Sequence, residues 1–197
     1  EAVAAGYNGP LYAEISPRTF SVKVRQGSRL SQLRLRRGQQ SLDDAALTLL
    51  QQAHKIVRFD DQTQISIQDG IGLSVNLTPQ TDTELVGWRA RKHAGLIDVD
   101  VVGGQPAARF WEAVTLRDLT KGGLVLNPDE FYILASREFV TVPPDYAAEM
   151  RAYDTRVGEF RAHYAGFFDP GFGVDASGAR PTRAVLEVRS HDVPFLI

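Results

Sequence analysis

The chain has 197 residues, of which 43% are hydrophobic and 23% charged, and its formal net charge is −2. These are ordinary values for a globular protein. The sequence has no basic run, which argues against a nucleic-acid partner, and no apolar run of ~20 residues, which argues against a membrane span. The absence of cysteine excludes disulfides, Cys-x-x-Cys zinc sites and thiol catalysis, and it is typical of a cytoplasmic protein.

The first part of the chain predicts three strands and a helix. Alternating residues with high β-propensity predict strands at Pro10–Ile15, Thr19–Val24 and Arg29–Arg36. A helix is expected over Ser41–Lys55, with Ser41 as its N-cap and two acids in its first turn. Its expected inward face consists of Leu42, Ala45, Ala46, Leu49, Leu50 and Ala53.

Short apolar segments then alternate with Gly, Pro and Asp turns, which is typical of a barrel or sandwich. The expected strands lie at residues 64–68, 72–77, 95–102, 123–128, 131–136 and 138–143. A short helix is predicted over Pro143–Asp154 because Pro stands at its start. The fold class expected is mainly β, a distorted barrel or jelly roll with a few short helices.

Two segments of the chain resemble each other. Leu11–Val24 aligns without a gap on Ala184–Ile197, and the alignment places Glu14 on Glu187. Each acid lies between apolar neighbours on a predicted strand. Strand alternation would let both carboxylates simply point into solvent, whereas a repeated functional unit would place them at equivalent positions.

The stretch YAGFFDPGFG (Tyr164–Gly173), followed by a strand with Leu-Glu at its centre, resembles the dCTP deaminase branch of the trimeric dUTPase and dCTP deaminase superfamily. Phe131–Met150 resembles the segment before that family's phosphate motif, and Gly9–Leu35 resembles the end of another family unit. The resemblance implies two fused dUTPase-like units. Residues 1–38 would be the last strands of the first unit, and residues 39–197 the second unit without its last strands.

That resemblance implies deamination without zinc, because the family uses a strand carboxylate as general base and proton shuttle. It places this role on Glu187, with Glu14 as its counterpart in the first unit. A partly apolar pocket prepares such an acid for proton transfer. It also implies an oligomer, homo-oligomeric or pseudo-trimeric, whose active sites form where units meet.

The resemblance implies that Arg151 and Arg156 hold the triphosphate, with Mg²⁺ bound through the nucleotide. Ala152 departs from the family, which has a serine at this position, so one phosphate and water ligand is missing. A site that pairs Glu14 with this motif would therefore be weakened. Glu187 is accordingly favoured over Glu14 as the active residue.

The turn after the phosphate motif would read the base. Its small residues Ala165 and Gly166 would allow close approach of the backbone, and Asp169 would brace the turn. Gln32, on the Gln-Leu strand of the first unit, is a further expected substrate-binding residue.

Three functions remain open at this point. The favoured one is dCTP deaminase, which yields dUTP and ammonia. The second is dUTP pyrophosphatase, a different hydrolytic reaction in the same superfamily, which Phe172 after the Asp-Pro-Gly turn leaves open. The third is a non-catalytic nucleotide-binding or oligomerisation unit, to which Ala152 lends weight.

Overall fold

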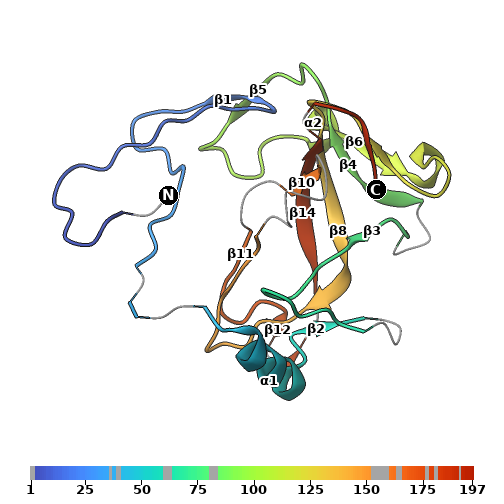
Figure 1. The fold of residues 1–197 in the computed structure, drawn as a ribbon. Helices are drawn as coiled ribbons and strands as arrows, with labels where there is room; N and C mark the ends of the chain where they lie inside the picture. Colours follow the sequence, from blue (N-terminus) through green and yellow to red (C-terminus); the bar gives the residue numbers. More distant parts are fainter. Residues whose placement is uncertain are drawn as a thin grey trace.

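The computed structural model describes residues 3–35, 37–38, 41–59, 64–79, 84–151, 160–162, 166–175, 178–179, 182–190 and 192–197. In these residues the chain is mainly β, as the sequence predicts, and its sheets do not close into a barrel (Figure 1). The largest sheet of the described part has seven strands. They are β2 (Val57–Arg58), β3 (Val75–Asn76), β4 (Leu85–Ala90), β6 (Trp111–Thr115), β8 (Phe131–Val140), β10 (Phe160–Ala162) and β14 (Thr182–Ser190).

Strand β8 is the centre of this sheet. The main path runs β10-β14-β8-β4-β6, and β2 and β3 also pair with β8. The even-numbered residues of β8 are buried and most of the others are half-buried, which is the period-2 pattern of a strand with one core face. The core is formed mainly by Val57, Val86, Val114, Leu124, Leu126, Tyr132, Leu134, Val140, Val142, Phe168, Ala184, Leu186 and Val188.

Four short two-stranded ladders surround the large sheet. They pair β1 (Ser21–Lys23) with β5 (Leu96–Asp98), β7 (Val125–Leu126) with β15 (Phe195–Leu196), β9 (Ala148–Glu149) with β11 (Phe167–Phe168), and β12 (Val174–Asp175) with β13 (Gly178–Ala179). Only the β1–β5 pair among these ladders is parallel. The short helices are α2 (Ala107–Phe110) and the 3₁₀ turn η1 (Leu116–Asp118). None of the described helices has the length and apolar run needed to cross a bilayer.

The predicted first helix is present as α1 (Asp44–His54), but its N-cap is Asp43 and not Ser41. The Asp43 carboxylate accepts a hydrogen bond from the Ala46 amide at 2.8 Å, which satisfies one of the free amides of the first turn. The expected inward face is also wrong in part, since Leu49 is 66% exposed and Leu50 packs on the core.

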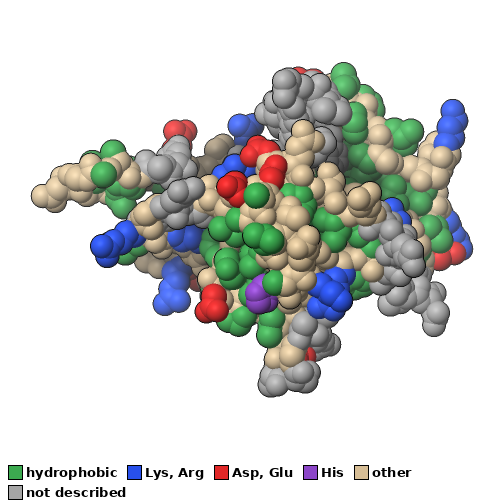
Figure 2. Space-filling view, turned by 60° about the horizontal axis from the view of Figure 1, so that its bottom comes forward, with side chains coloured by type: hydrophobic (Ala, Val, Ile, Leu, Met, Phe, Trp, Pro, Cys, Tyr) green, Lys and Arg blue, Asp and Glu red, His purple; other side chains and the backbone are tan. Residues whose placement is uncertain are grey.

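The surface seen from the lower side of the molecule is mixed. Figure 2 shows apolar side chains there among charged side chains of both signs.

The helix predicted over Pro143–Asp154 is wrong for the part that the structure describes, Pro143–Arg151. This segment forms a turn, in which the Tyr146 amide donates to the Pro143 carbonyl at 3.0 Å, and then strand β9. The backbone of β9 pairs with Phe167 and Phe168. The tertiary ladder therefore satisfies the backbone groups that a helix would have satisfied, and it overrides the local propensity.

Two of the three strands predicted before residue 36 are also wrong in the described residues. Only Ser21–Lys23 pairs, whereas Pro10–Ile15 and residues 29–35 have no ladder. Their apolar side chains stay in solvent, and Tyr12 and Leu35 are 89% and 92% exposed. A strand needs a neighbour for its hydrogen bonds, and alternation alone does not supply one.

Consequently the expected equivalence of Glu14 and Glu187 is wrong in this structure. Glu187 belongs to β14 in the large sheet, whereas Glu14 lies in an exposed segment without strand pairing. The segment after Glu14 does contact the rest of the molecule. Phe20 packs edge-to-face on Phe110 and Trp111, with ring centroids 5.4 Å apart in both pairs, and the Arg189 guanidinium donates to the Thr19 hydroxyl at 2.7 Å.

Candidate functional site

Strand β14 holds Glu187 on the outward face of the large sheet. Its neighbours Leu186 and Val188 point into the core, and strand alternation therefore turns the Glu187 side chain outward. Glu187 is exposed, so the apolar enclosure expected from the sequence is not formed within the described residues. The position of Glu187 matches the simpler alternative of an outward-pointing strand acid.

The surroundings of Glu187 on that face are apolar. Register places Glu187 opposite Ile133 of β8, and Ile133 opposite Trp88 of β4, so the three residues form a row across the sheet. Val185, two residues before Glu187 on the same face, is 59% exposed. Within the described residues, Glu187 is thus an exposed acid beside half-buried Ile133, and a second molecule or domain lying on this surface would desolvate it.

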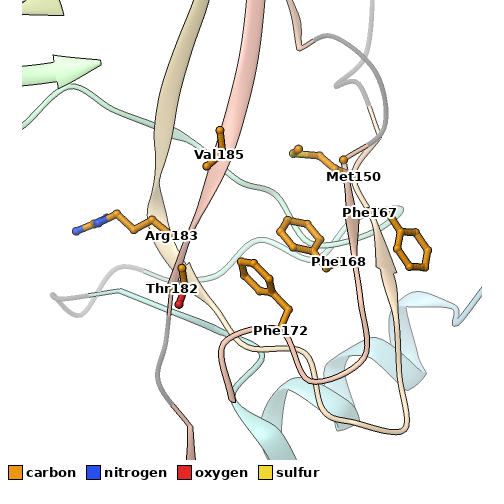
Figure 3. Close-up of a pocket in the computed structure, with 8 residues that line it drawn as sticks. Met150, Phe167, Phe168, Phe172, Thr182, Arg183 and Val185 are labelled. Carbon is orange, nitrogen blue, oxygen red and sulfur yellow. The ribbon is translucent and has the colours of Figure 1, made fainter. Parts of the chain in front are cut away.

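A pocket of about 250 Å³ lies next to Val185 (Figure 3). Its walls are mostly apolar. In Figure 3 the rings of Phe168 and Phe172 lie between the strand that carries Val185 and Phe167, which stands at the outer edge. The full lining consists of Met150, Gly166, Phe167, Phe168, Phe172, Thr182, Arg183 and Val185. The pocket therefore lies between the residues that flank the Asp-Pro-Gly turn and the strand of Glu187, and Gly166 belongs to its lining.

The Asp-Pro-Gly turn is fixed by main-chain hydrogen bonds. The Phe172 amide donates to the Asp169 carbonyl at 3.0 Å, while the Val142 amide donates to the Phe172 carbonyl at 2.8 Å and the Gly171 amide to the Val142 carbonyl at 3.1 Å. Gly171 has a φ of +84°, a conformation that favours glycine. Asp169 itself is exposed, so in the described residues its carbonyl, and not its side chain, braces the turn.

Gly166 accepts a hydrogen bond at its carbonyl from the Met150 amide at 2.7 Å. A Cβ atom at Gly166 would lie 2.6 Å from the Met150 Cε, so only glycine fits against this side chain as it stands. The sequence predicted that the small residue Gly166 would let the base approach the backbone closely. In this structure it is the Met150 side chain that lies close to the Gly166 backbone, and both residues line the pocket.

Arg183 is a pocket residue that the sequence did not single out. Here β8 has a bulge, because the register advances by two positions in β14 (Arg183 to Val185) and by four in β8 (Phe139 to Ala135). The Arg183 guanidinium donates to the carbonyl of Ser136 at 3.1 Å and to that of Arg137, and it lies 4.1 Å from the centre of the Phe139 ring. These contacts hold the guanidinium on the side of Arg183 that faces away from the rings of Phe168 and Phe172 (Figure 3).

Glu138 lies in the same bulge and is 2% exposed. Its two carboxylate oxygens accept hydrogen bonds from Ser74, at 2.8 Å from the amide and at 2.6 Å from the hydroxyl. The Ser136 hydroxyl donates to the Glu138 carbonyl at 2.6 Å and accepts from the Ala184 amide at 2.8 Å. The bulge next to the pocket is therefore stabilised by a buried polar network.

Arg34 is the second residue that the sequence did not single out. The centre of its guanidinium lies 3.4 Å from the centroid of the Phe167 ring, and its Nη2 donates to the Gln32 side chain at 3.0 Å. Gln32, which was predicted as a substrate ligand, contacts Arg34 and does not itself belong to the pocket lining. No local pattern could have revealed Arg34, because its ring partner is far away in the sequence.

The remaining predicted residues are placed as follows. Arg151 is exposed and directly follows Met150 of the pocket, whereas Glu14 is exposed and does not line it. Arg156 and Ala165 lie outside the described residues. Across the part of the chain that the structure describes, no three His, Asp or Glu side chains gather as a metal site would require.

A charged network lies at the end of the same sheet. The Tyr132 hydroxyl donates to the Glu130 carboxylate at 2.5 Å, and burial together with this bond raises the pKa of Tyr132 to about 12. Burial opposes ionisation of Glu130, but hydrogen bonds from Tyr132 and Asn127 and the charge of Arg89 leave its pKa below the usual value. Glu130 is therefore an ionised structural group.

Comparison with known proteins assigns the chain to a family. The family model of the 2'-deoxycytidine 5'-triphosphate deaminase C-terminal domain matches residues 43–197, and that of the N-terminal domain matches residues 1–39. The crystal structure of 2'-deoxycytidine 5'-triphosphate deaminase from Agrobacterium tumefaciens is similar to this chain, with a TM-score of 0.85. Its sequence is 49% identical, and the match covers 98% of this chain. The present chain spans 56% of that protein's chain. No curated protein matches.

Proposed function

Because the chain belongs to the 2'-deoxycytidine 5'-triphosphate (dCTP) deaminase family, we propose that it serves the hydrolytic deamination of dCTP to dUTP and ammonia. The observation that carries the proposal is the pocket, which is shared between the Asp-Pro-Gly turn and the strand of Glu187. The pocket would hold a flat ring, and Glu187 follows two residues after the lining residue Val185 on the same strand.

The pocket suits a pyrimidine. Its volume of about 250 Å³ lies below the ~300–1,000 Å³ typical of drug-sized ligands, so it accepts a single ring and not a large aromatic system. Phe168 and Phe172, with centroids 4.9 Å apart, provide apolar surface for the base. The backbone around Ala165, Gly166 and Asp169 would hydrogen-bond the edge of the base, with Gly166 in the pocket lining.

Glu187 would act as the general base without zinc. It takes a proton from water while the water oxygen bonds to C4 of cytosine, and it delivers this proton to N3. It then moves the proton of the new C4 hydroxyl to the amino group as the C4 carbonyl forms. The C4–N bond breaks and ammonia leaves. General-base catalysis is most effective when the acid is partly desolvated, so a further family unit in a homo-oligomer or pseudo-trimer would cover the row of Trp88, Ile133 and Glu187.

The triphosphate would lie beyond the base, held by Arg151 and Arg156. Guanidinium groups bind phosphate oxygens with paired hydrogen bonds, and Mg²⁺ would enter bound to the same oxygens. Ala152 has no hydroxyl to share in this contact, which supports the alternative of a non-catalytic nucleotide-binding unit. dUTP pyrophosphatase remains the other alternative.

One assay of the full-length protein separates the three functions. It measures the turnover of dCTP and of dUTP with separate readouts for ammonia and pyrophosphate. A deaminase releases ammonia from dCTP, a dUTP pyrophosphatase releases pyrophosphate from dUTP, and a non-catalytic unit binds nucleotide without either product. Binding of dCTP without any ammonia would refute the proposal.

A further inference from the structure

We propose that Arg34 binds the polyphosphate of the nucleotide at the rim of the pocket and so makes the site selective for the triphosphate. The inference rests on the proposed function. Arg34 lies in the segment that matches the N-terminal domain, whereas the pocket lies in the segment that matches the C-terminal domain. The site would then be completed by a residue from outside its own domain.

The position of Arg34 is the first support. Its guanidinium stacks on Phe167, 3.4 Å from the ring centroid, and Phe167 belongs to the pocket lining, with its ring turned away from those of Phe168 and Phe172 (Figure 3). Arg34 is exposed, and the base-sized space lies on the inner side of Phe168 and Phe172. A nucleotide whose base fills this space would have to extend its phosphates past Phe167 to reach Arg34.

The free donors of Arg34 are the second support. A guanidinium has five N–H donors in one plane, and stacking on a ring leaves this plane's edge open. Within the described residues Arg34 makes one hydrogen bond, to Gln32 at 3.0 Å. That bond orients the group, and four N–H donors remain for the paired contacts that phosphate oxygens make.

The charges nearby explain why the rim needs this cation. Glu149 lies opposite Phe167 in the β9–β11 ladder and would repel a polyphosphate. Arg183 also lines the pocket, but it donates to the carbonyls of Ser136 and Arg137. Arg34 stacks on Phe167, the residue opposite Glu149 in this ladder.

The experiment compares Arg34→Ala and Arg34→Lys with Arg29→Ala, an exposed arginine of the same segment, in the full-length protein. Three ligands are used: dCTP, deoxycytidine without phosphate, and inorganic tripolyphosphate as a competitor without a base. Arg34→Ala should raise the KM for dCTP and the Ki for tripolyphosphate together by ~10- to 100-fold, since a hydrogen bond to a charged group is of that strength. Deoxycytidine affinity and kcat should change less than ~3-fold, and Arg34→Lys should recover part of the loss.

Several results would overturn the inference. In one, Arg34→Ala behaves like Arg29→Ala. In another, deoxycytidine and dCTP weaken equally while the Tm falls, which marks a purely structural contact. Tripolyphosphate that fails to compete with dCTP in the wild-type protein also counts against it. A wild-type protein that binds dCTP but releases no ammonia refutes the proposed function instead, and dCTP dissociation constants then test Arg34 separately.

Discussion

Glu138 and Ser74 form a two-point contact in the interior, in which one serine supplies both an amide and a hydroxyl to one carboxylate. The acid lies in the β8 bulge, and the same bulge provides the carbonyls that hold Arg183 at the pocket wall. The contact thus links a buried acid to the shape of the candidate site.

Removing this contact should destabilise the fold. We expect Ser74→Ala to lower the free energy of unfolding by about 1–3 kcal/mol, because it leaves a buried carboxylate oxygen without its donor. Glu138→Ala should cost at least as much, since it also leaves a cavity. Glu138→Gln should cost less, because its amide can accept from the Ser74 N–H and donate to the hydroxyl. Urea unfolding curves measure all three, and a Glu138→Ala protein as stable as the wild type would disprove this role.

Glu187→Gln should abolish most deamination while leaving the protein folded. The side chain is exposed, so the change costs little stability, but an amide cannot accept the proton from water. We expect a ~10²–10⁴-fold loss of kcat with dCTP binding retained. Glu14→Gln serves as the control and should have the smaller effect. Near-normal ammonia release by Glu187→Gln combined with an inactive Glu14→Gln would reverse the assignment.

Gly166→Ala should weaken dCTP binding without unfolding the protein. The new methyl group would meet the Met150 Cε at 2.6 Å, and this flexible end can move only by changing the pocket that it lines. Gly72→Ala is a matched control, because its nearest side-chain contact would be an ordinary 3.9 Å. Titration calorimetry with dCTP and melting curves separate the two effects. Equal dCTP affinity in both variants would show that the pocket at Gly166 does not hold the nucleotide.

The attachment of the N-terminal segment should depend on pH through Asp98. Hydrogen bonds from Arg25 lower the pKa of Asp98 to about 2, against an ordinary value near 3.8. A lowered pKa stabilises the contact above the ordinary value, and this contribution is lost as the pH falls from about 4 through 2.

Hydrogen exchange at the β1–β5 ladder, corrected for intrinsic rates, should therefore accelerate over this pH range. Asp98→Asn cannot ionise and should remove this part of the pH dependence. An unchanged profile in Asp98→Asn would show that Asp98 does not cause this pH dependence.

The predictions from the sequence were more accurate where the alternation of apolar and polar residues was longer. β14 has a long alternation with an apolar face, so the strand and the outward direction of Glu187 could be anticipated. β8 was expected as two strands, at residues 131–136 and 138–143, but forms one strand, Phe131–Val140. The predictions for Pro10–Ile15 and Pro143–Arg151 were wrong because the structure of each segment depends on whether another strand pairs with it, which the local sequence does not show. Arg34 and Arg183 could not have been found, since a ring stack or a bulge contact between distant residues leaves no periodic pattern in the sequence.

The hydrogen bond between Arg189 and Thr19 joins residues 170 positions apart. Closing so long a loop is entropically expensive, and contacts of this kind form slowly. The β8–β14 pairing, with its shorter separation, can form without it. We therefore expect the large sheet to form first during folding and the N-terminal segment to dock last, which makes the Arg34–Phe167 contact a late event in the chain's assembly.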